Sequence, residues 1–145
     1  MISNEPLLMP GYSGTPLPKK LGIKDGYRVA LIAMPGEIRT DLKEALSKCR
    51  ISKDFAPALD FIHIFTRSHV ELERELKRAA KALAPAGMVW ISWPKKSSGV
   101  ETDLAEPYVR QHGLDVGLVD VKVCAVDETW SGLRFVYRLA DRPKR

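Results

Sequence analysis

The sequence predicts a single three-layer α/β domain whose mostly parallel, doubly wound sheet ends in an antiparallel hairpin. Three runs that are apolar on both faces, as buried parallel strands are, alternate with helical patterns. The C-terminal part changes to alternation of apolar and other side chains, which indicates a half-buried hairpin. The 145 residues suit one domain with its own core. We expect an irregular, Gly-, Pro- and Ser-rich arm over residues 1–26, the domain over 27–140 and a basic tail over 141–145.

The first strand is predicted from Val29 to Met34, and Pro35-Gly36 ends it. One apolar stripe at helical spacing follows, which predicts a single helix. The stripe consists of Ile38, Leu42, Ala45, Leu46 and Cys49.

The second and third buried strands are predicted at Phe61–Phe65 and Met88–Ser92. Between them, Ser68 and Glu71 have the spacing of a capping box, in which the hydroxyl accepts the backbone N–H three residues on. Apolar residues at helical spacing follow, so a helix begins after Ser68. Pro85-Ala86-Gly87 is predicted to end it.

A third helix is predicted from Thr102 to His112, with Pro107 in or near its first turn and Gly113 at its end. The alternating segments 119–125 and 133–139 flank a polar turn. They predict a hairpin at the edge of the sheet, where a reversed strand closes it.

Composition excludes several classes of protein. No run approaches the roughly 20 apolar residues that span a bilayer, and no secretory signal begins the chain, so we expect no membrane association. Cys49 and Cys124 lie far apart and are expected to be thiols, which favours the reducing cytoplasm. The net charge of +5 permits an anionic ligand or nucleic acid and argues for neither.

The order of elements is similar to the second half of the class I methyltransferase fold. Lys24–Val29 resembles the segment leading into that family's first strand, and Leu83–Ile91 resembles its step from helix to strand. The resemblance implies a shortened, Rossmann-like, methyltransferase-like fold, and it implies fold more than function.

Two features argue against the cofactor of that family, S-adenosylmethionine. The family holds it over a glycine-rich turn after the first strand, where only glycine allows close backbone approach, and an acidic residue ending the next strand takes the ribose hydroxyls. Here the turn Ala33-Met34-Pro35-Gly36-Glu37 offers one glycine, and Pro35 lacks an N–H. Only eleven residues separate Cys49 from Phe61, whereas a further βαβ unit needs about 30. The ribose-binding unit is therefore expected to be cut away, and we expect no cofactor.

A ligand of such a sheet lies at the carboxyl ends of the strands. The residues that follow the second and third strands predict a site for a small anion, because cations and a helix N-terminus favour phosphate or carboxylate. The predicted ligand-binding residues are Arg67, Ser68, Trp93, Lys95, Lys96 and Ser97. Further candidates are Tyr12, Asp127, Glu128 and Trp130. The alternative is that these are ordinary solvated loops.

Two points about this site stay open in the sequence. The turn 127–132 joins the crevice if the strand at Val119 runs parallel to the sheet, and lies at the opposite edge if it runs antiparallel. No residue is predicted to be catalytic: Asp127 and Glu128 lack an acid–base partner, and Cys124 lacks a placed histidine. His63 is expected to be a core histidine, and the histidines and cysteines have no metal-binding spacing.

Long strings of the sequence resemble an uncharacterised bacterial family known only as a domain of unknown function. They are residues 11–17, 19–23, 93–96, 102–104 and 121–133. The resemblance covers most of the chain and implies a bacterial cytoplasmic protein, but it brings no activity with it.

Three functions therefore remain, in this order. The first is a small module that binds an anionic ligand (phosphate, nucleotide or carboxylate) without identified catalysis. The second is a degenerate S-adenosylmethionine-dependent methyltransferase-like protein. The third is a protein- or nucleic-acid-interaction domain that uses the basic arm with Tyr12 and the turn at Trp130.

Overall fold

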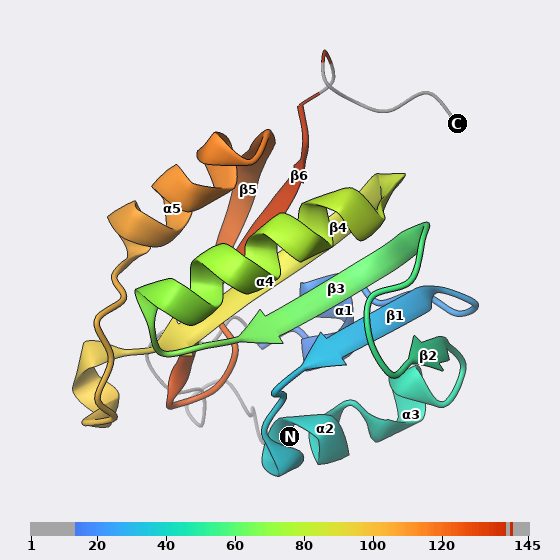
Figure 1. Ribbon diagram of the computed structural model, residues 1–145. Coiled ribbons are helices and arrows are strands. Elements are labelled where there is room, and N and C mark those ends of the chain that lie inside the picture. Colours follow the sequence, from blue (N-terminus) through green and yellow to red (C-terminus); the bar gives the residue numbers. More distant parts are fainter. Residues whose placement is uncertain (1–13, 139, 141–145) are drawn as a thin grey trace, which may run out of the picture.

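The computed structural model describes residues 14–138 and residue 140, which form a six-stranded sheet with helices on both faces (Figure 1). The strand order is β2-β1-β3-β4-β6-β5. The strands are β1 (Arg28–Ile32), β2 (Arg50–Ser52), β3 (Leu59–Phe65), β4 (Leu83–Pro94), β5 (Leu118–Ala125) and β6 (Trp130–Tyr137). The first four are mutually parallel, and β6 is antiparallel to both β4 and β5. The predicted α/β fold with C-terminal antiparallel strands is confirmed.

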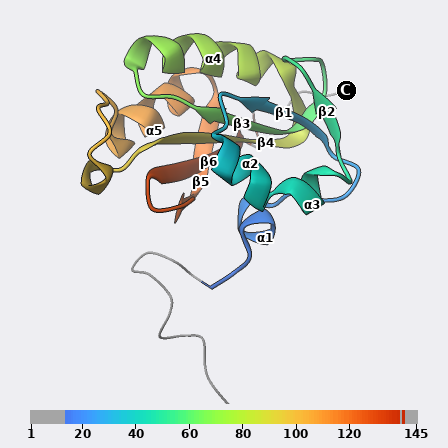
Figure 2. The same ribbon diagram turned by 90° about the horizontal axis from the view of Figure 1, so that it is seen from below.

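Helices cover the two faces of the sheet unequally (Figure 2). One face carries the long helix α4 (His69–Ala82) and α5 (Glu106–Asp115). The other carries the short helices α1 (Leu17–Leu21), α2 (Gly36–Asp41) and α3 (Lys43–Leu46). Each face has its own apolar core, the first around Leu72 and Phe135 and the second around Trp90.

The N-terminus of α4 follows the prediction. The Ser68 hydroxyl accepts the backbone N–H of Glu71 at 3.2 Å, which satisfies one of the free donors of the first turn. The end of the helix differs, because α4 passes at Ala82 directly into β4. Pro85-Ala86-Gly87 therefore lies inside a strand. A Cβ at Gly87 would stand 2.7 Å from the Leu59 carbonyl oxygen, so this glycine permits close approach of β4 to β3.

The predicted single helix over Ile38–Cys49 is two helices. The apolar stripe is placed correctly, since Ile38, Leu42 and Leu46 are buried, but Leu42 leaves helical geometry at φ −99° and ψ 1°. Just before the break, the Thr40 hydroxyl donates to the Gly36 carbonyl at 3.0 Å. This back-bonding bends helices, and it offers a local cause for the break.

The segment expected to be cut away keeps its strand. β2 pairs in parallel with β1 from Arg28↔Arg50 to Ala30↔Ser52. Three residues are too few for a periodicity to show in the sequence, which is why the strand was missed. After β2 the chain returns to β3 without a helix, so only part of a βα unit is absent.

Part of the predicted irregular arm belongs to the core. Leu21, the last residue of α1, is fully buried, and its carbonyl accepts the indole N–H of Trp90 at 2.7 Å. Gly22 ends this helix in the left-handed conformation, φ 85°. Residues 1–13, including Tyr12, and the predicted basic tail lie outside the described part of the chain.

The helix predicted from Thr102 to His112 begins later, at Glu106, with Pro107 in its first turn as expected. Gly113 lies inside α5 and does not end it. A Cβ at Gly113 would stand 2.0 Å from a carbon of the Phe135 ring, so packing against β6 requires the glycine. No helix among the described residues is long and apolar enough to cross a membrane.

The direction of the hairpin strands shows at which edge of the sheet the turn between them lies. Because β6 is antiparallel to both neighbours, β5 runs parallel to β4, and the turn 126–129 lies at the carboxyl edge of the sheet. The Lys95 N–H donates to the Thr129 carbonyl at 2.8 Å, which ties the turn to the end of β4. The reversed strand β6 is internal, and the edge strand is β5, contrary to the expectation that the reversed strand closes the sheet.

Candidate functional site

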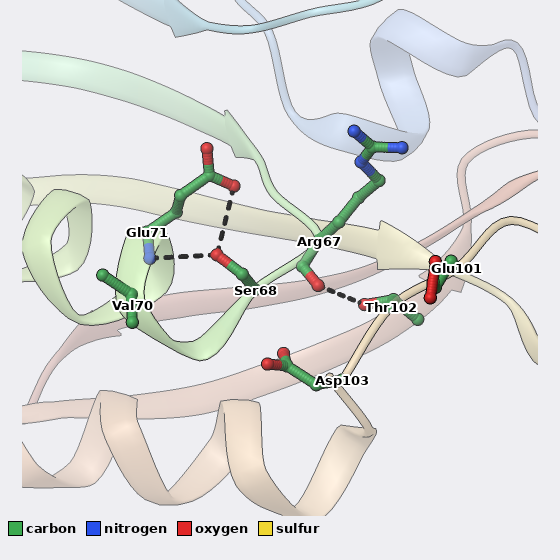
Figure 3. Close-up of a pocket in the computed structure, with 7 residues that line it drawn as sticks. All are labelled: Arg67, Ser68, Val70, Glu71, Glu101, Thr102 and Asp103. Atoms are coloured by element: carbon green, nitrogen blue, oxygen red, sulfur yellow. Dashed lines mark hydrogen bonds between the residues drawn. The ribbon is translucent and has the colours of Figure 1, made fainter.

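Two adjoining hollows open above the carboxyl ends of the parallel strands. The larger, of about 640 Å³, lies between the loop after β3, the first turn of α4 and the loop before α5 (Figure 3). The smaller, of about 320 Å³, is bounded by the turn after β1, the end of β3 and the start of β6. Both are lined by Arg67 and Glu71, and together they form what we call the crevice.

The turn after β1 reaches the crevice in an unusual conformation. Ala33, which lines the smaller hollow, has φ 57°, in the left-handed region that glycine adopts freely and other residues avoid. The backbone therefore turns here as a glycine would, although the sequence has alanine. Pro35 then forms the N-cap of α2 without a side-chain hydrogen bond.

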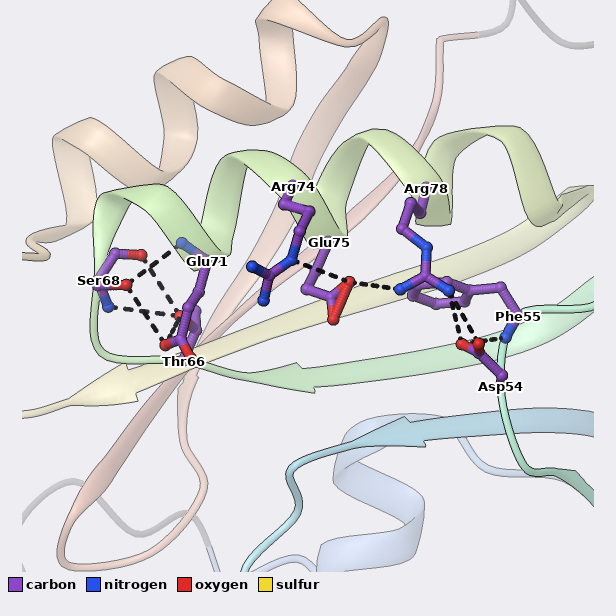
Figure 4. Close-up of polar contacts among 8 residues, drawn as sticks. All are labelled: Asp54, Phe55, Thr66, Ser68, Glu71, Arg74, Glu75 and Arg78. Carbon is purple, nitrogen blue, oxygen red and sulfur yellow. Dashed lines mark hydrogen bonds and ion pairs between the residues drawn. The ribbon is translucent and has the colours of Figure 1, made fainter.

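Two hydroxyl groups hold the carboxylate of Glu71 at the N-terminus of α4. The Thr66 hydroxyl donates to Glu71 Oε1 at 3.1 Å, and the Ser68 hydroxyl lies 3.3 Å from the same oxygen (Figure 4). Glu71 Oε2 takes part in no hydrogen bond among the described residues. The carboxylate is thus fixed through one oxygen and has the other available to a ligand.

The larger hollow carries more negative than positive charge. Arg67 shares the lining with three carboxylates, those of Glu71, Glu101 and Asp103. Asp103 Oδ1 accepts the backbone N–H of His69 at 2.9 Å, so the protein's own carboxylate already occupies the N-terminus of α4. The Thr102 hydroxyl holds this loop through the Arg67 carbonyl at 2.6 Å.

The structure separates the residues predicted to form one anion site. Arg67 and Ser68 line the crevice. Trp93 is 5% exposed in the core, and Lys95, Lys96 and Ser97 line neither hollow.

The further candidates from the hairpin turn also have separate places. Trp130 lines the smaller hollow. Asp127 caps the turn, because its Oδ1 accepts the backbone N–H groups of Thr129 and Trp130, each at 2.8 Å. Glu128 is exposed in the turn and lines neither hollow.

Sequence reasoning missed the left-handed conformation of Ala33, and it missed the 100–103 loop as a part of the crevice. Nothing in the local pattern of Ala33 signals a positive φ. The 100–103 loop was placed wrongly because Thr102 and Asp103 were assigned to a helix. Their bonds to Arg67 and His69 join residues more than thirty positions apart, and no local spacing shows this.

The carboxylate expected to bind a ribose in this fold has a different role here. β2 ends beside Ala30, short of the crevice, and the first carboxylate after it is Asp54. Both of its oxygens accept from Arg78 of α4, at 2.8 and 2.9 Å, and one also accepts the Phe55 N–H. Figure 4 shows this pair at the far end of α4 from Ser68. The described residues therefore do not fit the ribose end of S-adenosylmethionine.

His63 lies beneath the crevice in the middle of the sheet and is fully buried. Its Nε2 lies 2.8 Å from the Ser92 hydroxyl, and its ring stacks on Phe65, which lines the smaller hollow, with centroids 4.3 Å apart. Burial lowers the pKa of His63 to about 3. The imidazole is therefore neutral at physiological pH and packs as a core residue.

Comparisons with known proteins bear on the fold. No family model and no curated protein matches the chain. A putative type 11 methyltransferase from Sulfolobus solfataricus is similar over 89% of this chain and 94% of its own, with 17% identity and a TM-score of 0.55. Magnesium protoporphyrin IX methyltransferase from Synechocystis PCC 6803 is similar over 84% and 74%, with 11% identity and a TM-score of 0.56. A precorrin-6y C5,15-methyltransferase from Geobacter metallireducens is similar over 84% and 86%, with 14% identity and a TM-score of 0.53.

Identities this low carry information about architecture alone. The strand order, the reversed β6 and the crevice at the carboxyl edge agree with these likenesses. The chain has the α/β Rossmann-like fold of the S-adenosylmethionine-dependent methyltransferases.

Proposed function

We propose that this chain is a degenerate methyltransferase-like protein that binds a small zwitterionic molecule of the S-adenosylmethionine class in the crevice. The observation that carries the proposal is the pair of opposite charges, Arg67 and Glu71, on an otherwise largely apolar hollow. A ligand with a carboxylate beside an ammonium group, as every amino acid has, matches that pair.

The contacts of the two residues support this. The Arg67 side chain is exposed and takes part in no hydrogen bond or ion pair among the described residues, so its guanidinium is available to a carboxylate. Glu71 Oε2 is available to an ammonium group. Phe65, Val100 and Trp130 supply an apolar wall beside them. Two similar structures, an Aeropyrum pernix fibrillarin and the Synechocystis enzyme, contain bound S-adenosylmethionine.

We call the protein degenerate because the crevice, as the described residues form it, lacks the contacts that would hold the ribose of S-adenosylmethionine. Asp54 is held by Arg78 away from the crevice, and Pro35 removes one backbone donor from the first turn. The proposed function is therefore binding, without methyl transfer. The proposal places the protein in the bacterial cytoplasm, as the sequence resemblance implies, and needs no protein or nucleic-acid partner.

A simple anion is the second candidate, and the unpaired Arg67 favours it. The charge of the larger hollow opposes it, because three carboxylates stand beside this one cation. Lys95 and Lys96, on which the anion site was predicted, do not contribute to the lining.

Calorimetric titration with S-adenosylmethionine, S-adenosylhomocysteine, methionine, adenosine and pyrophosphate tests the proposal. We expect the first three to bind and adenosine alone to bind much more weakly. Arg67→Gln and Glu71→Gln should each weaken binding by about tenfold, the effect of one lost charge-assisted hydrogen bond. Arg74→Gln, which removes a cation one turn along α4, should change nothing.

Two results would contradict the proposal. Binding of pyrophosphate but not of the amino-acid ligands, with loss in Arg67→Gln, would establish the anion function instead. Binding of the amino-acid ligands that both crevice variants leave unchanged would place the site elsewhere.

A further inference from the structure

The hairpin carries a second group of cations, separate from the crevice. Lys122 of β5 and Arg134 of β6 are directly opposite each other across the two strands. Lys20 of α1 lies against them, and Lys95 follows the end of β4. We call these four residues the cationic cluster. None of them lines either hollow of the crevice.

Hydrogen bonds and packing bring three members of the cluster, Lys20, Lys122 and Arg134, together on the face that α1 covers. Lys122 Nζ donates to the Lys20 carbonyl at 3.2 Å, and Lys20 Nζ donates to the Ala125 carbonyl at 2.7 Å. A Cβ at Gly22 would stand 3.6 Å from Arg134 Nη1, which places the guanidinium against the end of α1.

The half-buried thiol of Cys124 lies among these cations. Burial raises its pKa, and Lys20, Lys122, Arg134 and Lys95 act in the opposite direction without reversing the shift. Among the described residues, no carboxylate contributes to the shift of this pKa. Cys124 is therefore a reporter of the positive field of the cluster.

The nearby acidic residues of the hairpin do not neutralise these charges. Asp120 accepts from Arg110 of α5, on the opposite face, at 3.0 Å. Asp127 Oδ1 is committed to the backbone of its own turn. Among the described residues, no ion pair involves Lys95, Lys122 or Arg134.

Without a bound ligand, the cationic cluster destabilises the folded protein. Like charges directly opposite each other on neighbouring strands are destabilising. Arg134 Nε is buried and has no hydrogen-bond partner among the described residues, which leaves a charged donor desolvated without compensation. An anion placed beside Lys122 and Arg134 would offset the repulsion between them.

We propose that the cationic cluster binds a compact phosphate-bearing molecule beside Cys124. Phosphate fits because it combines a high charge with several acceptor oxygens, and arginine binds it in bidentate fashion. The ligand is small because Lys20, Lys122 and Arg134 lie together beside one half-buried thiol. They do not form the extended stripe that tracks a nucleic-acid backbone.

The test uses full-length protein with Cys49→Ala, so that Cys124 is the remaining thiol. Pyrophosphate is the probe, and its affinity is measured by calorimetry. Its effect on Cys124 is measured as the rate of alkylation by neutral iodoacetamide. We expect bound pyrophosphate to slow alkylation several-fold, because it cancels the field that favours the thiolate.

Lys122→Gln and Arg134→Gln should each lower pyrophosphate affinity by about fivefold or more and should remove the effect on alkylation. Lys122 is exposed, so its variant keeps the fold even if the Arg134 variant does not. Lys81→Gln, an exposed cation on α4, is the matched control and should behave as the parent protein. Arg67→Gln should also leave the affinity unchanged, which separates this site from the proposed function of the crevice.

Three results would overturn the inference. One is the absence of pyrophosphate binding in the parent protein. Another is binding that Lys122→Gln leaves intact. The third is a short oligonucleotide that binds more tightly than pyrophosphate with a steep salt dependence, since this would make the cluster a nucleic-acid surface.

Discussion

His63 is a titratable side chain enclosed in the core of the sheet, with one ring nitrogen unsatisfied. Nε2 is paired with Ser92, while Nδ1 is buried without a hydrogen-bond partner among the described residues. Protonation would place a charge among Phe61, Phe65 and Trp90. Burial therefore lowers the pKa from 6.5 to about 3.

This shift predicts a specific loss of stability in acid. Because the pKa of the folded state is depressed, the unfolded state binds the proton first. The stabilisation is complete above pH 6.5 and is lost as the pH falls towards 3. Each pH unit in that window should lower the free energy of unfolding by about 1.4 kcal/mol.

Urea unfolding of the parent protein and of His63→Gln at about pH 7, 5.5 and 4.5 measures this contribution. Glutamine cannot titrate and keeps a polar group towards Ser92. Contributions of the other groups cancel in the difference, so the gap between the two proteins should narrow, or reverse, as the pH falls. A gap independent of pH would mean that His63 titrates normally or becomes hydrated.

At the scale of elements, the contact between α5 and β6 depends on a glycine inside a helix. Alanine is the better helix former by about 1 kcal/mol, so Gly113→Ala would stabilise an isolated helix. In the protein, the added methyl group would meet the Phe135 ring at 2.0 Å. We expect Gly113→Ala to lower the free energy of unfolding by about 1–3 kcal/mol, the usual cost of overpacking.

A double-mutant cycle separates this clash from helix propensity. Phe135→Leu makes room, so alanine at Gly113 should cost less in that background than in the parent protein. Additive effects of the two substitutions, measured by chemical denaturation, would show that the ring does not limit this site.

The elements that the sequence predicts well are those with a long or capped pattern. α4 has both an N-cap and four turns of apolar spacing, and its start is where Ser68 predicts it. The short elements escape prediction for different reasons. β2 is three residues long, and the break at Leu42 leaves the apolar stripe unchanged. Pro85-Ala86-Gly87 has turn composition, but it lies in a register shift within β4, between the pairs Leu59↔Leu83 and Phe61↔Met88.

At the scale of the whole molecule, the crevice was harder to predict than the sheet that supports it. Its location at the carboxyl edge follows from the parallel order of β1, β3 and β4. Its charge does not, because Glu101 and Asp103 enter the crevice through a loop anchored to Arg67 and His69. The cations expected to meet there are divided, with Arg67 in the crevice and Lys95 in the cationic cluster.

Packing across the whole molecule also shows where the domain begins. The arm predicted over residues 1–26 would be dispensable, yet α1 supplies the fully buried Leu21 and the acceptor for Trp90. Leu21→Ala should therefore destabilise the entire domain, by about 2–5 kcal/mol, and not merely loosen one segment. Leu17→Ala, at a half-buried position of the same helix, is the matched control and should cost less.

Two probes followed through the same urea titration distinguish a core element from an arm. Tryptophan fluorescence reports on the tryptophan environments, including that of buried Trp90, and far-UV circular dichroism reports on the helices of both faces. If α1 belongs to the cooperative unit, Leu21→Ala lowers both midpoints together, because loss of packing under Trp90 is transmitted through the sheet. If only the fluorescence changes while the circular dichroism transition stays in place, α1 is an independent arm and the domain begins at residue 27.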